Sequence, residues 1–200
     1  MTPPKALHAA IAVPFLYWGN LVLSSLLNPG YSNMRQQVSE LGANAASHPM
    51  IFNGLILATG VAQLVGAYGY YQALRRLAVG PSLSGLSALV LTLFGVAVLM
   101  AGFFPLPNPL HGGKYLGIVV LLGPPLLVAA LWRQPHTARI NAYLVITTVL
   151  SLAILCLRLG FGAVVTAHNL GLFQRVDAFV SLLWIAVAAC FLRRRVLEIQ

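Results

Sequence analysis

Acidic residues are almost absent from this chain. Its 200 residues include three Asp or Glu against twelve Lys or Arg, and charged residues make up 8% of the total. A soluble domain carries roughly 25% charged residues, so this chain cannot cover a water-exposed surface, and a soluble globular protein is excluded. Hydrophobic residues make up 59% of the chain, which indicates that lipid covers most of the exterior.

Cysteine is also scarce. Cys156 and Cys190 both lie inside apolar runs, so we expect small buried apolar residues rather than a disulfide scaffold or a metal site. The net charge of +9 does not indicate a nucleic-acid partner. Lys and Arg lie almost entirely between apolar runs, which is the pattern that orients membrane proteins.

The motifs of several enzyme classes are missing. The chain has no Walker loop, no GxSxG elbow and no HExxH pair. Metal sites need three or four ligands held in shape, and no His or acid pair has helical metal-ligand spacing, so we expect no metal. Nothing in the sequence identifies a cofactor.

Long apolar runs dominate the chain. A spanning helix needs about 20 mostly apolar residues, and six runs qualify: residues 6–27, 50–74, 83–104, 115–132, 142–165 and 176–192. The sequence therefore predicts an all-α fold, a polytopic membrane helical bundle with six transmembrane helices in a single domain over residues 1–200. Because Arg158 interrupts the fifth run, five spans with residues 158–175 as a re-entrant or interfacial segment remain an alternative.

The basic residues predict the orientation. One side would hold eight of the twelve: Lys5, Arg75, Arg76, Arg133, Arg139, Arg193, Arg194 and Arg195. The other side would hold at most four. Because cytoplasmic loops carry the excess of Lys and Arg, we expect cytoplasmic N- and C-termini. The first apolar run lacks a cleavage pattern, so it is expected to be a retained span.

Ionisable residues gather in the loops of the predicted outer side. They are Arg35, Glu40, His48, His111, Lys114, His168, Arg175 and Asp177. If the helices pack as one bundle, these loops meet, and we expect Glu40, His111 and at least one of His48 and Arg175 to converge in a polar pocket. The candidate ligand-binding residues are Arg35, Glu40, His48, Asn53, His111, Lys114 and Arg175. The alternatives are that Glu40 only pairs with Arg35 and that the loops are polar by default.

Arg158 is predicted to form a structural ion pair. A cation within an apolar run is costly and requires a partner or a path to the interface. Glu40 and Asp177 are the acids within reach. Asp177 on the adjacent run is the expected partner.

Three segments carry a family resemblance. They read "NMRQQVSELGANAASHPMIFNG", "AGFFPLPNPLHG" and "GLFQRV", and their order and spacing resemble the bacterial six-span membrane proteins of the domain of unknown function 998 family. The first segment is more loosely similar to the Frag1/DRAM/Sfk1 group of lipid-related membrane proteins. The resemblance implies a membrane fold, an outward polar site and no particular reaction. The residues it marks are Ser39, Glu40, Gly42, Asn53, Pro105, His111, Gly112 and Arg175.

These observations favour a binding function in the cytoplasmic membrane of a bacterium. We expect the outer polar residues to bind a lipid headgroup or a small molecule. One alternative is an accessory subunit of a larger membrane complex, with partner membrane subunits. Another is an intramembrane enzyme that uses the Glu/His cluster. The expected partners are membrane lipids, with no nucleic acid.

Overall fold

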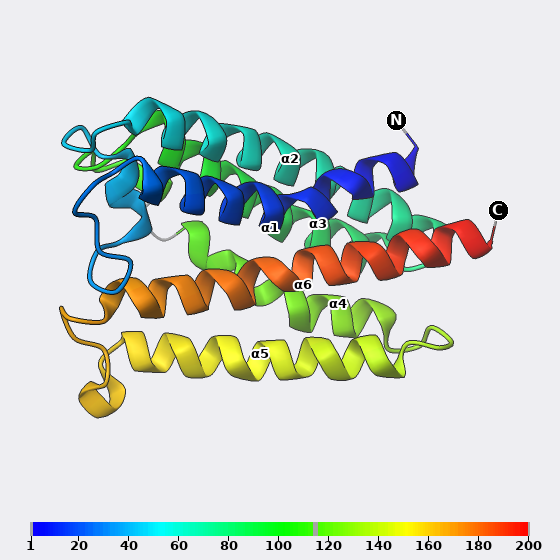
Figure 1. The fold of residues 1–200 in the computed structure, drawn as a ribbon. Helices are drawn as coiled ribbons and strands as arrows, with labels where there is room; N and C mark the ends of the chain where they lie inside the picture. Colours follow the sequence, from blue (N-terminus) through cyan, green and yellow to red (C-terminus); the bar gives the residue numbers. More distant parts are fainter. Residues whose placement is uncertain (1, 114–115, 200) are drawn as a thin grey trace.

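The fold is a bundle of long helices. The computed structural model describes residues 2–113 and 116–199, and within these ranges every regular element is helical (Figure 1). Five helices are long and apolar enough to cross a membrane: α1 Pro3–Leu26, α2 Pro49–Arg76, α3 Pro81–Phe103, α5 Ala138–Arg158 and α6 Leu170–Glu198. Helices satisfy their own backbone hydrogen bonds, which lipid cannot do. The predicted all-α membrane bundle is confirmed.

The predicted fourth span differs from the others. It consists of the 3₁₀ helix η3, Leu116–Leu122, followed by α4, Gly123–Leu131, while its predicted start at Tyr115 lies outside the described residues. Pro124 and Pro125 cannot donate backbone hydrogen bonds, so α4 begins anew where η3 ends. At standard rises the two pieces cover about 27 Å, just under the ~30 Å of hydrocarbon. The count of six long spans is therefore not confirmed.

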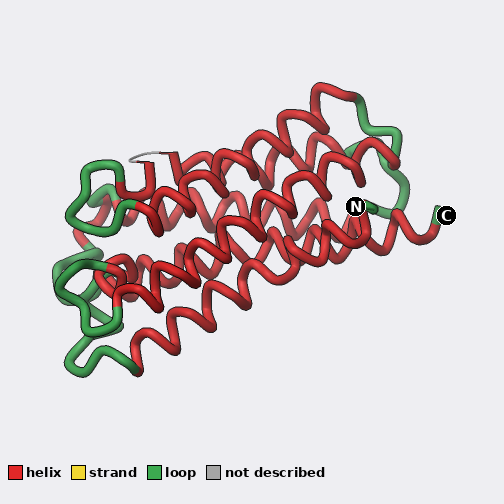
Figure 2. Tube along the Cα trace, turned by 90° about the horizontal axis from the view of Figure 1, so that it is seen from above, coloured by secondary structure: helices red, strands yellow, loops and turns green. Residues whose placement is uncertain are grey.

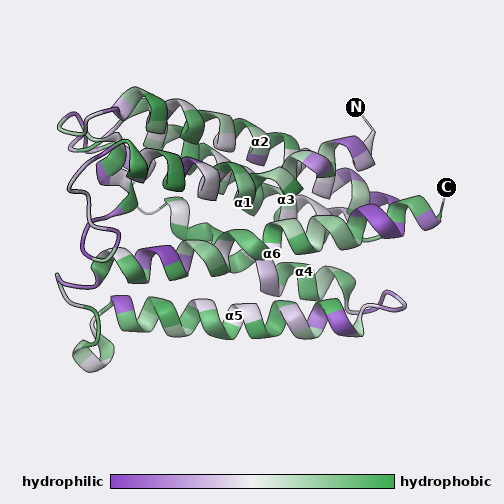
Figure 3. Ribbon diagram, in the orientation of Figure 1, coloured by the Kyte–Doolittle hydropathy of each residue, from purple (hydrophilic) through white to green (hydrophobic). Residues whose placement is uncertain are grey.

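The two ends of the bundle are different. Both termini lie at one end, with the short connections α2–α3 and α4–α5; we name this the terminal end (Figures 1 and 2). The longer segments 27–48, 104–113 and 159–169 lie at the other, the loop end (Figure 1). Figure 3 shows hydrophobic residues along the helices and hydrophilic ones towards both ends.

The fifth helix ends earlier than the sequence predicted. It stops at Arg158 instead of near residue 165, because Gly160 and Gly162 adopt left-handed backbone angles with φ of 97° and 74°. Arg158 therefore lies at the loop end of α5 rather than inside the span. The sixth helix is longer than predicted, since it begins at Leu170 and includes the basic tail.

Close helix contact in the bundle depends on glycines of α2. A Cβ on Gly69 would lie 2.8 Å from Leu7 N and 2.9 Å from Ala6 C, and a Cβ on Gly66 would lie 2.9 Å from Ala10 Cα. Small residues let two helix backbones approach in this way. The main hydrophobic core of the bundle contains Trp184 and Tyr70, which are among its largest fully buried side chains.

The cysteine prediction is half right. Cys156 and Cys190 are free thiols, but both are exposed on the surface of the bundle. They face the surroundings because α5 and α6 each bury only one side. In a membrane that exposed side meets lipid, so an apolar run does not by itself place a residue in the protein core.

Replacing Gly69 tests the α1–α2 contact. Gly69→Ala places a methyl group against backbone atoms that cannot move aside, so we expect a loss of roughly 1–3 kcal/mol of stability. Thermal unfolding in detergent micelles measures the change. The control is Gly54→Ala in the same helix, where a Cβ meets nothing within 4 Å. Equal melting temperatures for the two variants would contradict this packing.

Candidate functional site

The first loop-end segment is docked on the start of α6. Its 3₁₀ helix η1, Val38–Gly42, buries Val38 and Leu41 in a small apolar cluster. Its backbone also meets α6 directly. Leu172 N–H donates to Met34 O at 3.0 Å, and Val38 N–H donates to the Gln174 side chain at 2.7 Å. A Cβ on Gly171 would collide with Gln36 O, so only glycine permits this approach.

Arg175 fastens this segment to α6. Its side chain is 8% exposed, and its guanidinium donates to Gln36 O (3.1 Å), Gly171 O (2.8 Å), Asn33 Oδ1 (2.9 Å) and the Tyr31 hydroxyl (2.6 Å). It also lies 5.5 Å from the centre of the Tyr31 ring. All four hydrogen bonds are made to protein atoms rather than to a ligand. Arg175 therefore positions the loop segment, a role that was not predicted from the sequence.

Tyr31 completes this arrangement. Burial raises the pKa of the Tyr31 hydroxyl, while the hydrogen bond and the charge of Arg175 act in the opposite direction. The hydroxyl therefore stays protonated at neutral pH. It accepts from Arg175 and donates to Gln37 O at 2.9 Å.

Glu40 is held within its own loop. One carboxylate oxygen accepts from Gln37 N–H at 2.7 Å, as part of a capping box between Gln37 and Glu40 at η1. The other accepts from Gln36 Nε2 at 3.0 Å. Arg35 is exposed, and among residues 2–113 and 116–199 it forms no ion pair with Glu40. Glu40 does line a loop hollow of about 310 Å³ with Tyr31 and Ser47.

The predicted histidines form no hydrogen bond with Glu40 in the described residues. His48 is exposed at the start of α2. The Nδ1 atom of His111 lies 2.9 Å from Phe104 O in its own loop. Asn53 donates to Gly42 O at 3.0 Å, and Lys114 lies outside the described residues.

No hydrogen bond in the described part of the chain joins Glu40 to a His or Arg of another loop. Nor do residues 2–113 and 116–199 contain a cluster of three or more metal-ligating His, Cys, Asp or Glu side chains. Ligand binding by the outer residues stays a prediction. The Glu/His cluster on which the enzyme alternative depended is not assembled by direct contacts.

A second polar group lies deeper at the loop end. Arg158 Nη1 forms an ion pair with Asp177 Oδ2, the partner that the sequence analysis named. Asp177 is seven residues into α6, about 10 Å below its first residue. Ser181, one turn further, donates to Asp177 Oδ1 at 3.4 Å. The pair thus joins the end of α5 to the interior face of α6.

Two hollows flank this ion pair. Their volumes are about 220 Å³ and 370 Å³, and both are lined by Gly117, Val120, Arg158, Asp177 and Ser181. The smaller one is also lined by Tyr17, Thr59 and Gln174. Among the described residues the Tyr17 hydroxyl has no hydrogen-bond partner, whereas Thr59 donates to Leu55 O at 2.8 Å. Tyr17 therefore offers a free hydroxyl to whatever fills this space.

The sequence contained part of the signal for this site. Gln174, Asp177 and Ser181 are three and four residues apart, so they share one face of α6. That polar face in an apolar run indicates an interior partner. Tyr17 and Thr59 carry no comparable signal, because only the packing of α1 and α2 brings them to α6.

Arg175 and Arg35 form a test pair. Arg175→Lys keeps the charge but loses the guanidinium bonds to several acceptors at once. We expect amides of residues 31–42 to exchange hydrogen faster, with a stability loss on the order of 2–3 kcal/mol. Hydrogen–deuterium exchange measures this. Arg35→Lys, at an exposed position of the same segment, should leave exchange unchanged, and equal exchange in both variants would remove the role given to Arg175.

One comparison with known proteins identifies a family. A family model described as protein of unknown function (DUF998) matches residues 11–190. No significant match to the chain was found among curated proteins or among solved structures. The looser similarity to the Frag1/DRAM/Sfk1 group stays a prediction. Because the family match covers all but the ends of this multi-pass membrane protein, the chain belongs to the DUF998 family.

Proposed function

We propose that this protein binds an amphipathic ligand, with the polar headgroup at the Arg158–Asp177 pair. The observation that carries the proposal is the pair of hollows of about 220 and 370 Å³ on either side of these two residues. Asp177 lies about two turns into α6, and an ionisable residue within an apolar membrane helix is costly and by default indicates a functional site. Here Arg158 and Asp177 line both hollows.

The exposure of the ion pair favours exchange with a ligand. The side chains of Arg158 and Asp177 are 35% and 24% exposed, so the pair is partly open. Pairs of this kind contribute only about 0–1 kcal/mol to stability. Arg158 can bind a phosphate and Asp177 an amine, which matches a zwitterionic headgroup, and the Tyr17 hydroxyl adds a neutral contact.

The larger hollow supports a ligand with a hydrocarbon part. It is lined by apolar side chains of η3 and α5, among them Ile118, Leu121, Leu155 and Leu159. Ile118 and Leu159 are exposed on the bundle surface. The hollow therefore reaches the surface where lipid lies, so an acyl chain can enter from the side.

A partner membrane subunit is the second candidate. A groove of about 620 Å³ between α1 and α6 is lined almost wholly by apolar side chains, including the exposed Phe15, Leu26 and Phe179. Gly19 leaves open space on the same face. Lipid chains also fill such a groove, so this observation favours the subunit less than the polar hollows favour the ligand.

The proposal includes a location and an orientation. We infer a bacterial cytoplasmic membrane with the termini inside, supported by eight basic residues predicted for the terminal end. The Arg158–Asp177 site then belongs to the outer leaflet. A headgroup bound there comes from the outer leaflet or from the space beyond it.

Removing both charges of the pair tests binding. In Arg158→Gln with Asp177→Asn no charge is left unpaired, so the fold should persist. We expect wild type purified in mild detergent to retain a lipid or small molecule, and this double variant to retain at least about tenfold less, or ~1.4 kcal/mol of binding. Mass spectrometry of the extracted ligand measures both.

The matched control removes the other Arg–acid pair. Arg194→Gln with Glu198→Gln has the same effect on net charge at the terminal end, where the two side chains are 3.0 Å apart, and it should retain the ligand. Equal retention by both double variants refutes the proposed site. A co-purifying protein chain, with no small ligand, favours the subunit instead.

Cysteine labelling from outside intact cells tests the orientation. In a background without Cys156 and Cys190, a cysteine at the exposed Ala45 should react with an impermeant maleimide, and one at the exposed Ser82 should not. Ala45 precedes α2 at the loop end, and Ser82 lies in the first turn of α3 at the terminal end. Labelling at position 82 alone would invert the assignment of the two faces.

A further inference from the structure

The start of α5 lacks the usual helix cap. Thr137 occupies the capping position, but its hydroxyl donates to Leu131 O (3.0 Å) and Gln134 O (2.8 Å). No side chain caps this helix of 21 residues, and its first turn contains no acid. The first backbone hydrogen bond runs from Asn141 N–H to Thr137 O at 2.9 Å. The amides of residues 138–140 thus remain as donors for an anion.

A groove opens at these amides. Its volume is about 670 Å³, and its lining includes Thr137, Ala138 and Asn141. Asn141 is 9% exposed, and its Nδ2 donates to Thr137 Oγ1 at 3.3 Å. Its buried Oδ1 has no hydrogen-bond partner in the described ranges of the chain. An unpaired buried acceptor costs stability, and a ligand hydroxyl that meets Oδ1 when the Asn141 side chain turns towards the groove would remove that cost.

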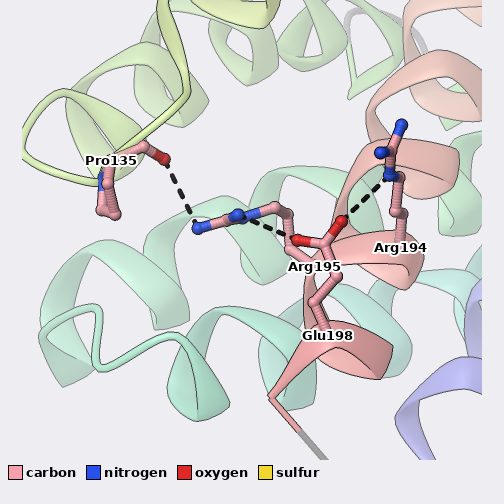
Figure 4. Close-up of polar contacts among 4 residues, drawn as sticks. All are labelled: Pro135, Arg194, Arg195 and Glu198. Atoms are coloured by element: carbon pink, nitrogen blue, oxygen red, sulfur yellow. Dashed lines mark hydrogen bonds and ion pairs between the residues drawn. The ribbon is translucent and has the colours of Figure 1, made fainter.

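Positive charge surrounds the groove. Arg133 and Arg139 are sequence neighbours of residues that line the groove, and both are exposed. Arg195 reaches the α4–α5 connection and donates to Pro135 O at 3.4 Å (Figure 4). The acid at this end, Glu198, is already bonded to Arg194 (3.0 Å) and Arg195 (2.9 Å). A negatively charged group therefore meets uncompensated cations here.

The rest of the groove lining is apolar apart from Gln134 and His136. Trp132 is 71% exposed, which suits the membrane interface, where Trp is enriched. Val145 and Ile146 continue the lining along the outer side of α5. A hydrocarbon chain can lie against this side while its headgroup meets the helix start.

From these contacts we propose that the groove at the start of α5 binds an anionic glycerophospholipid of the surrounding membrane. Its phosphate accepts from the amides of residues 138–140 and faces Arg133 and Arg139. A headgroup hydroxyl donates to Asn141 Oδ1, and an acyl chain follows Val145 and Ile146. This site lies at the terminal end, so it is independent of the one at Arg158 and Asp177.

The experiment places a competing anion in the site. In Ala138→Glu a carboxylate occupies the first turn of α5, which favours the helix and excludes a phosphate. Full-length protein in non-ionic detergent is titrated with phosphatidylglycerol and measured by native mass spectrometry. We expect binding to fall about tenfold or more in this variant, because like charges about 4 Å apart repel strongly. The matched control is Ser82→Glu, at an exposed first-turn position of α3 at the same end, which should bind as wild type does.

Two further outcomes decide the chemistry of the ligand. Wild type should prefer phosphatidylglycerol over phosphatidylmethanol, which lacks the hydroxyls, and Asn141→Leu should lose that preference while still binding both. Glycerol 3-phosphate should not compete, because it lacks the acyl chains. Undiminished binding by Ala138→Glu, no preference in wild type, or displacement by glycerol 3-phosphate overturns the proposal.

Discussion

The ion pair between Arg158 and Asp177 joins the loop end of α5 to α6 and sets the position of both charges. α5 packs mainly on α4 and α6, and Figure 1 shows it at the margin of the bundle. This pair is the side-chain hydrogen bond that the described residues form between the two helices. Because hydrocarbon cannot solvate either charge, the pair requires an interior face and leaves polar space beside it.

Other contacts at the loop end position the segments around these hollows. Arg175 fixes the first loop segment on α6 through three hydrogen bonds, and Gln174, its neighbour, contributes to both the docked segment and the smaller hollow. On the side towards α5, η3 makes fewer contacts than α4 does. One helix, α6, therefore carries the structural contacts on one part of its first turns and the site on another.

Much of this fold could be predicted from the sequence. Apolar run length identified the five long helices, and the scarcity of acids made Asp177 the expected partner of Arg158. The fourth span could not be predicted in detail, because hydropathy does not distinguish a 3₁₀ stretch from an α-helix. The end of α5 depended on two left-handed glycines, whose backbone angles no apolar run reveals.

The candidate site was harder to predict than the fold. The distribution of Lys and Arg correctly predicted that Glu40, His48, His111 and Arg175 lie at the same end of the bundle. Residues at one end of a bundle need not be in contact, however. Glu40 bonds its carboxylate within its own loop, and the Arg175 guanidinium donates to two backbone carbonyls and two side chains. Tyr17 and Thr59 were not predicted, because their neighbourhood arises from the packing of α1, α2 and α6, in which Gly66 and Gly69 bring two backbones together.

A structure of the protein in lipid nanodiscs would test the central claim most directly. The measurement is the density between Arg158, Asp177 and Tyr17. The account predicts a bound amphiphile with its headgroup within hydrogen-bonding distance of both charged side chains and its chain between η3 and α5. Hollows that are closed, or that hold only water beside an intact ion pair, would contradict it.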